Sequence, residues 1–162
     1  MKSRLLHLLI EIVAIVAFGW ITLNYLFGIV QMPDDSMYPK VMAGDVLLYS
    51  RMESGYHIND VVSTTVEGTE YILRVVAQGG DTVDFSEDGF LIVNDQIQYE
   101  EITQESYAIE DAEMSYPYQV PAGSYFLLAD ARTDGIDSRI FGARTIKQIN
   151  GKVIGSFRHR QF

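Results

Sequence analysis

The 162 residues of the chain include no cysteine. The protein can therefore have neither a disulfide framework nor a thiolate metal site. Its three histidines, His7, His57 and His159, are far apart in the sequence, which argues against a zinc site. We expect neither a bound metal nor a cofactor.

Basic residues are also scarce, with 12 Lys and Arg against 22 Asp and Glu, for a net charge of −10. Lys2, Arg4 and Glu11 lie in or before the N-terminal apolar run, which leaves 10 basic and 21 acidic residues, or −11, for the rest of the chain. Proteins that bind nucleic acid need clustered cations. We therefore expect no nucleic-acid partner.

One long apolar run extends from Leu8 to Val30 and has one acidic interruption, Glu11, close to its polar end. About 20 apolar residues are enough for a helix to cross a hydrocarbon core roughly 30 Å thick. A cleavable signal peptide is the rival interpretation, but the apolar region would be long for one and no small-x-small site follows at residues 28–32. We therefore expect an uncleaved anchor in contact with membrane lipid.

The charges on either side of this run predict its orientation. Lys2 and Arg4 precede it, whereas Asp34 and Asp35 follow it. Because basic residues are retained on the cytoplasmic side, the N-terminus should be cytoplasmic. We expect residues 1–30 to form the cytoplasmic N-terminus and single-pass cell-membrane anchor, and residues 31–162 to form one extracytoplasmic domain.

The sequence pattern of the second region predicts a mostly β domain. Short runs of Val, Ile, Leu, Tyr and Phe alternate with Gly, Asn and Asp about every ten residues. Asn94-Asp95 should form the turn of a hairpin, because both residues tolerate positive φ. Residues 100–115 hold six acidic residues and no basic one, which predicts a solvated loop or an excursion at a sheet edge. The expected strands are residues 46–49, 61–65, 71–77, 82–85, 90–93, 96–99, 124–128 and 153–157.

Several short motifs follow the apolar run in a fixed order. The first is Asp35-Ser36-Met37-Tyr38-Pro39, and the later ones include Arg74-Val75-Val76 and Asp137-Ser138-Arg139. In this order the chain resembles the type I signal peptidases of peptidase family S26. The other matching fragments are Gly44-Asp45-Val46, Asp60-Val61-Val62, Gly80-Asp81-Thr82-Val83, Asp130 with Arg132, Phe141-Gly142 and Gly151-Lys152-Val153.

The resemblance implies a signal-peptidase-like β domain with Ser36 as the nucleophile. In this family a lysine takes the proton of the serine, and it can do so only where apolar surroundings lower its pKa. The lysine position corresponds to Leu73 in this chain. Shifting the alignment by one residue reaches only Ile72 or Arg74, and a guanidinium stays protonated. The match at Asp137 and Arg139 implies a structural ion pair.

Two further departures lie near the expected active site. Gly135 replaces a serine that orients the lysine in the family, and Asp34 lies where the family commonly has Gly or Ser beside the oxyanion. A carboxylate there would repel the negative charge that develops in the tetrahedral intermediate. Loss of both the base and the group that orients it is typical of a discarded catalytic dyad.

A relocated base would have to be another residue of the domain. The candidates are Lys40, Lys147, Lys152 and, more remotely, His57, because Lys2 lies across the membrane. Lys40 follows Pro39 and should point to solvent or lipid headgroups, whereas Lys152 matches a lysine of the family. These positions favour neither Lys40 nor Lys152 as the general base.

These observations leave three hypotheses. The first is a catalytically degenerate signal-peptidase-like protein that binds secreted precursor proteins or pilin precursors in extended conformation. It would act as an assembly factor, with sortase or other pilus machinery of Gram-positive bacteria as further partners. The second is an active signal peptidase that uses Ser36 with a relocated base. The third is a purely structural membrane module in which Ser36 is only a turn residue. Leu73 favours the first hypothesis over the second.

Overall fold

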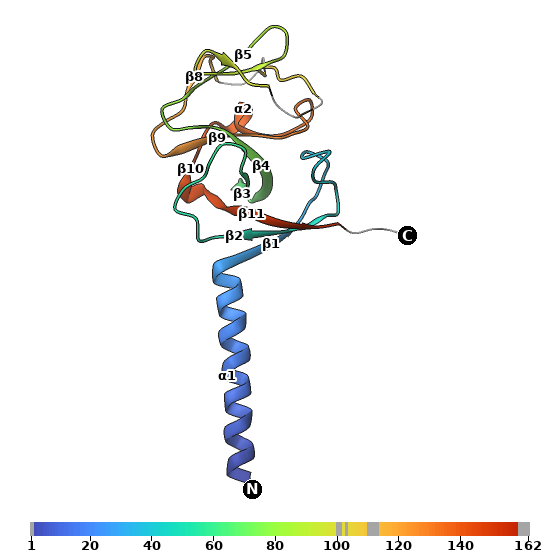
Figure 1. The fold of residues 1–162 in the computed structure, drawn as a ribbon, viewed down its shortest axis with the longest axis vertical. Helices are drawn as coiled ribbons and strands as arrows, with labels where there is room; N and C mark the ends of the chain where they lie inside the picture. The colour runs from blue at the N-terminus through green and yellow to red at the C-terminus, as the bar shows by residue number, and fades with distance from the viewer. Residues whose placement is uncertain (1, 100–101, 103, 110–113, 159–162) are drawn as a thin grey trace.

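A computed structural model describes residues 2–99, 102, 104–109 and 114–158. Helix α1, Lys2–Leu26, projects away from a β domain formed by the rest of the chain (Figure 1). Its segment Leu6–Leu26 has a mean hydropathy of 2.2 and no side chains buried against the domain. Helix α1 is thus long and apolar enough to cross a membrane.

The end of the apolar run is not helical. After Leu26 the chain enters strand β1, Phe27–Gln31, which pairs antiparallel with β2, Val46–Ser50. A Cβ at Gly28 would lie 2.1 Å from a ring carbon of Tyr49, so the strand can approach β2 only because this residue is glycine. Residues 27–30, which the sequence assigns to the anchor, therefore belong to the β domain.

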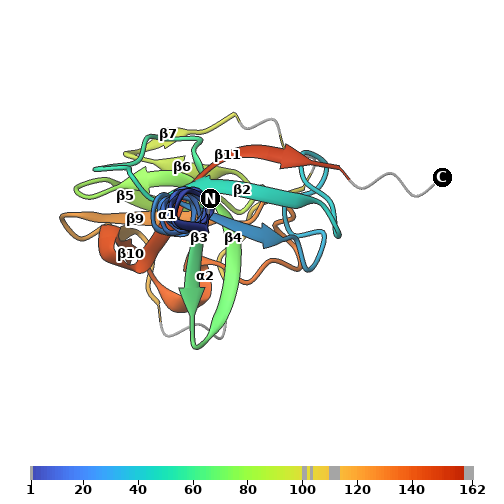
Figure 2. The same cartoon turned by 90° about the horizontal axis from the view of Figure 1, so that it is seen from below.

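Two antiparallel sheets make up the domain. The larger has the strand order β1-β2-β11-β3-β4-β9-β10, and the smaller has the order β7-β6-β5-β8. Seen along α1, strands β1, β2 and β11 lie next to the end of the helix (Figure 2). The remaining elements are β3 Val61–Val66, β4 Thr69–Gln78, β5 Thr82–Phe85, β6 Leu91–Val93, β7 Gln96–Ile97, β8 Tyr118–Gln119, β9 Ser124–Leu128, α2 Ser138–Phe141, β10 Arg144–Thr145, η1 Ile146–Gln148 and β11 Ile149–Phe157.

The structure confirms the mostly β prediction, and each predicted strand overlaps an observed one. Asn94 and Asp95 have φ angles of 52° and 62°, as the predicted hairpin turn requires. Of the two alternatives predicted for residues 100–115, the solvated loop does not hold at Ser106, which is 2% exposed and accepts a hydrogen bond from Arg132. Residues 100–101, 103 and 110–113 of that loop lie outside the described residues.

Strand β4 separates two parts of the core. Leu73 and Val75 pack on one face, whereas Ile72 packs on the other with Met37 and Leu47. This division follows from the alternation of side chains along a strand. The position of Leu73 in β4 therefore determines which residues surround it.

Candidate functional site

Ser36 lies in the turn between β1 and β2. The next residue, Met37, is fully buried and packs in the core with Val41 and Ile72. The Asp35 carboxylate accepts a hydrogen bond of 2.8 Å from the amide of Ala43, which closes the turn. The turn therefore holds Ser36 half-buried at the surface.

A cavity of about 200 Å³ lies at Ser36. The turn, β4 and the loop after β9 all contribute to its walls, and the amide of Ala131 donates a 2.8 Å hydrogen bond to the Ser36 carbonyl. The structure therefore brings Ser36 next to the segments that carry Leu73 and Gly135. The cavity is lined by Asp34, Asp35, Ser36, Tyr71, Asp134 and Ile136.

Leu73 is 1% exposed and lies in a closed apolar cluster. Its neighbours there include Val62, Val75, Leu127 and Ala129. It belongs to the same face of β4 as Tyr71, which lines the Ser36 cavity. An isobutyl group at this position cannot accept a proton.

Gly135 is packed against Ala129, a residue that the sequence did not single out. A Cβ at position 135 would lie 2.3 Å from the Ala129 Cβ and 2.9 Å from the Ala131 carbonyl oxygen. Real Cβ atoms do not approach so closely, so the Ala129 methyl group occupies the space that a serine at position 135 would need. In the sequence, this contact is indicated only by the small size of the two residues, which are six positions apart.

The Asp34 side chain contacts the backbone of Ser36. Its Oδ1 accepts a hydrogen bond of 2.9 Å from the amide of Ser36. This amide belongs to the residue in the nucleophile position itself. In this structure it is already bonded to a carboxylate.

The alternative bases lie elsewhere. Lys152 Nζ is 2.7 Å from Asp60 Oδ1 in an ion pair, and the His57 side chain is 89% exposed. Burial alone would raise the pKa of Asp60, but hydrogen bonds from Lys152 and the His57 amide lower it overall. Lys147 is exposed in η1, and Lys40 lines a separate cavity. In the part of the chain that the structure describes, none of these four candidates lines the Ser36 cavity.

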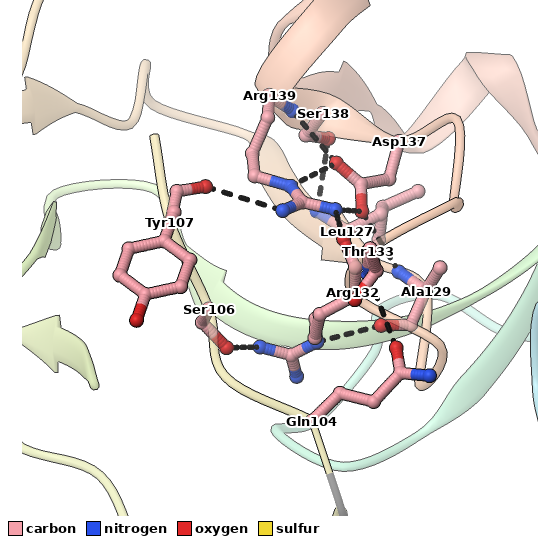
Figure 3. A network of polar contacts seen from close by, with 10 residues as sticks. All are labelled: Gln104, Ser106, Tyr107, Leu127, Ala129, Arg132, Thr133, Asp137, Ser138 and Arg139. Atoms are coloured by element: carbon pink, nitrogen blue, oxygen red, sulfur yellow. Dashed lines mark hydrogen bonds and ion pairs between the residues drawn. The ribbon is translucent and has the colours of Figure 1, made fainter. Parts of the chain in front are cut away.

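The loop that carries Gly135 is fixed by the ion pair that the resemblance implied (Figure 3). Arg139 Nε and Nη2 each donate a 2.9 Å hydrogen bond to Asp137, one to each carboxylate oxygen. Asp137 Oδ2 also accepts from the Ala129 amide, and the Ser138 hydroxyl accepts from the Leu127 amide. These contacts tie α2 to the end of β9.

Two more buried arginines support the same region, and the sequence did not predict their contacts. Arg132 donates through Nε to the Ala129 carbonyl at 2.6 Å and through Nη1 to Ser106 Oγ at 2.7 Å (Figure 3). Arg74 Nε donates to Asp130 Oδ1 at 2.7 Å in a buried ion pair. Buried hydrogen bonds and ion pairs thus connect the segments around Ser36.

Comparison with known proteins shows where this scaffold occurs. The family described as "Signal peptidase, peptidase S26" matches residues 5–157. A thylakoidal processing peptidase 1 of Arabidopsis thaliana is 31% identical over 161 residues, which cover 85% of this chain and 45% of that protein. The chain thus spans less than half the length of that relative.

A bacterial relative matches over a larger share of its length. Signal peptidase I S of Bacillus subtilis is 24% identical over 160 residues, which cover 93% of this chain and 87% of that protein. The crystal structure of a signal peptidase I from Enterococcus faecalis superposes with a TM-score of 0.50 at 23% identity, covering 61% of this chain and 97% of that chain. This structural likeness supports the fold only.

Proposed function

The chain belongs to the peptidase S26 signal peptidase family, and we propose that it is a catalytically inactive member that binds secreted precursor proteins in extended conformation. The observation that carries this proposal is the burial of Leu73 in an apolar cluster where the family requires a lysine. The Ala129 methyl group supports it, because it fills the space of the orienting side chain as well.

The chemistry of serine hydrolysis makes the loss of the base decisive. A serine hydroxyl is a poor nucleophile until a base within hydrogen-bond reach accepts its proton. In serine peptidases, removing a member of the catalytic unit lowers the rate by a factor on the order of 10⁶. Such a residual rate would be too slow to process secreted proteins.

Asp34 adds a second obstacle to catalysis. The oxyanion of a tetrahedral intermediate is normally stabilised by amide donors that are free to bind it. Here the Ser36 amide donates to the Asp34 carboxylate. A substrate carbonyl would have to displace this carboxylate and then develop negative charge beside it.

Binding of an extended chain does not need the dyad. Strand β9 pairs with β4 only from Arg74 onward, so the described strands leave residues 69–73 of β4 paired on one side, with β3. The backbone groups of Val75 bond on the β3 side, to Asp60 and Asn59. By alternation, those of Ile72 point to the open side, next to the Ser36 cavity. This edge can bind a peptide by strand addition.

The clients that fit this proposal are precursor proteins delivered at the membrane. Helix α1 would anchor the domain with its N-terminus in the cytoplasm, and the cleft would receive preproteins or pilin precursors outside it. Sortase or other pilus machinery would then act on the bound precursor. In its general form the proposal names any preprotein segment with small side chains as the client. In its more specific form the client is a pilin precursor.

Rebuilding the dyad tests the proposal. The variant carries Leu73→Lys, Gly135→Ser, Asp34→Gly and Ala129→Gly, the last of which makes room for the serine. We expect slow cleavage of a small-x-small preprotein by this variant and none by the wild type. The matched control adds Ser36→Ala and should abolish the new activity.

Binding is measured in parallel with the full chain in detergent. The unaltered protein should bind an extended precursor peptide without cleaving it, and the same peptide with N-methylated amides should bind more weakly, because it cannot pair with β4. Failure of both the peptide and its methylated form to bind would contradict the binding role. Cleavage by the wild type would contradict the inactive role.

A further inference from the structure

The smaller sheet lies at the end of the β domain away from α1, where β5 and β8 are labelled in Figure 1. Between Arg74 and Arg132 the sequence has no Lys, Arg or His but 12 Asp and Glu residues. This segment therefore contributes only acidic charged side chains, whereas the nearest basic ones come from other segments: Arg132 bonds Ser106, and Lys40 and Arg74 line the adjoining cavity. Such an asymmetry favours cationic partners at this end.

A groove of about 340 Å³ crosses this end, and we call it the distal groove. It runs between the turn before β6, the end of β7 and residues 104–106. The Ser106 amide donates a 2.7 Å hydrogen bond to the Gly89 carbonyl, and the Gln98 amide donates to the Leu91 carbonyl at 2.8 Å. The walls of the groove are thus held by backbone hydrogen bonds. Its lining residues include Asp88, Phe90, Leu91, Tyr99, Ile102 and Glu105.

Aromatic side chains stand exposed along the distal groove. Tyr99 is 89% exposed and Phe90 is 43% exposed, and their ring centroids are 6.5 Å apart in an edge arrangement. Ile97, 45% exposed, lies two residues before Tyr99. Exposed apolar residues that form a group on a protein surface mark interaction sites more often than single exposed apolar residues do. Asp88 and Glu105 supply the only charged side chains among the described lining residues.

We infer that the distal groove binds a segment of a partner protein in which Lys or Arg side chains adjoin apolar ones. The carboxylates of Asp88 and Glu105 match the cations, and the exposed faces of Phe90 and Tyr99 accept both cation–π and apolar contacts. A membrane is excluded as the occupant, because the groove lies away from the end that carries α1. A nucleic acid is excluded by its charge.

This site is separate from the proposed precursor cleft. The distal groove and the Ser36 cavity have no lining residue in common. The protein would therefore hold a precursor at one site and a basic partner protein at the other. The inference goes beyond the proposed function and is tested independently of it.

The experiment measures the binding of a fluorescent peptide by the full chain in phosphatidylcholine nanodiscs. The probe alternates Lys and Arg with Leu and Phe, and its charge-inverted form has Glu at the basic positions. We expect the basic probe to bind with an affinity that falls as salt rises from about 0.05 M to about 0.5 M, because exposed charges are screened. The inverted probe should not bind. Absence of binding by the basic probe would overturn the inference.

Variants locate the site. Phe90→Ala with Tyr99→Ala, and separately Asp88→Asn with Glu105→Gln, should each weaken binding roughly tenfold, as loss of central contacts does at interfaces. Tyr38→Ala and Glu67→Gln remove an exposed ring and an exposed carboxylate elsewhere and should leave the affinity unchanged. Asp34→Asn with Asp134→Asn removes two of the three carboxylates that line the Ser36 cavity. If this variant loses the probe while the groove variants keep it, the distal groove is not the site.

Discussion

Ala129 and Gly135 lie in such close contact that a side chain at position 135 has no space. Their separation in the chain hides the contact, which appears only when the loop after β9 folds back on itself. The Gly135 amide donates to the Ala131 carbonyl in that loop, and the Ala129 methyl fills the space beside it. A design that restores only the serine and the lysine would therefore fail for steric reasons.

This contact predicts a compensating pair of substitutions. Gly135→Ser alone should lower the free energy of unfolding by about 1–3 kcal/mol, the usual cost of overpacking a buried site. Adding Ala129→Gly should recover most of that loss. Urea unfolding of the two single variants and the double variant measures the coupling. Additive effects of the two substitutions would show that the side chains do not compete for space.

The buried pair of Arg74 and Asp130 predicts a larger effect. Asp130→Asn removes the carboxylate that binds two nitrogens of the buried guanidinium. Breaking one partner of a buried ion pair costs about 3–5 kcal/mol. The control Asp134→Asn changes an exposed carboxylate four residues away and should alter stability by less than about 0.5 kcal/mol. Equal melting temperatures for the two variants would contradict this account.

The sequence predicted individual strands better than contacts. The alternating runs that become β3, β4, β5 and β9 were found because period-two patterns are local. Strand β1 was missed because Phe27–Gln31 continues an apolar run, and only its pairing with β2 separates it from the helix. At the site, the resemblance to signal peptidases assigned roles to Ser36, Leu73 and Asp34. Ala129 and the Arg74–Asp130 pair depend on tertiary contacts that no local pattern reveals.

The outer face of β1, β2 and β11 forms an apolar surface next to α1. Ile29 pairs with Leu48, which also pairs with Gly155, so these residues share one face. Phe157 pairs with Val46 on the same face, and Ile29 and Phe157 are 73% and 65% exposed. Because β1 directly follows the helix, this face should rest in the headgroup region of the membrane.

Site-directed labelling tests this placement, since the chain has no cysteine of its own. A polarity-sensitive dye on Ile29→Cys, in full chain reconstituted into nanodiscs, should be quenched by spin-labelled lipid. The same dye on Asp95→Cys, in the β6–β7 turn of the distal sheet, should not be quenched. Equal quenching at both positions would show that the sheet does not face the bilayer.

The residue before β3 is joined to the interior of β11 by the Asp60–Lys152 ion pair, which predicts a pH effect. The pKa of Asp60 is lowered in the folded state, so its contribution to stability is present above the unfolded pKa of about 4 and is lost as the pH falls through the folded value. Lys152→Met should therefore lower the free energy of unfolding at neutral pH. It should also reduce the dependence of that free energy on pH in the acid range. Lys147→Met, at an exposed site, should leave the profile unchanged. If Lys152→Met lowered the free energy of unfolding equally at every pH, the link between Asp60 ionisation and stability would be refuted.

The molecule as a whole consists of an apolar helix and a signal-peptidase-like β domain, and in our proposal its Ser36 site lacks a base. The buried ion pairs Arg74–Asp130 and Arg139–Asp137 hold the segments around Ser36 together, while in our proposal Leu73, Ala129 and Asp34 together prevent catalysis. The account thus separates retention of the fold from retention of the activity. It also requires that the cleft remain able to hold an extended chain.

The most direct test is a long incubation of the purified wild-type chain in detergent with a preprotein, analysed by mass spectrometry beside Ser36→Ala. We predict that the two proteins give identical spectra, with no fragment produced by cleavage after a small-x-small site. A fragment that forms with the wild type and is absent with Ser36→Ala would contradict the account. It would show that Ser36 is activated by a base other than a residue at position 73.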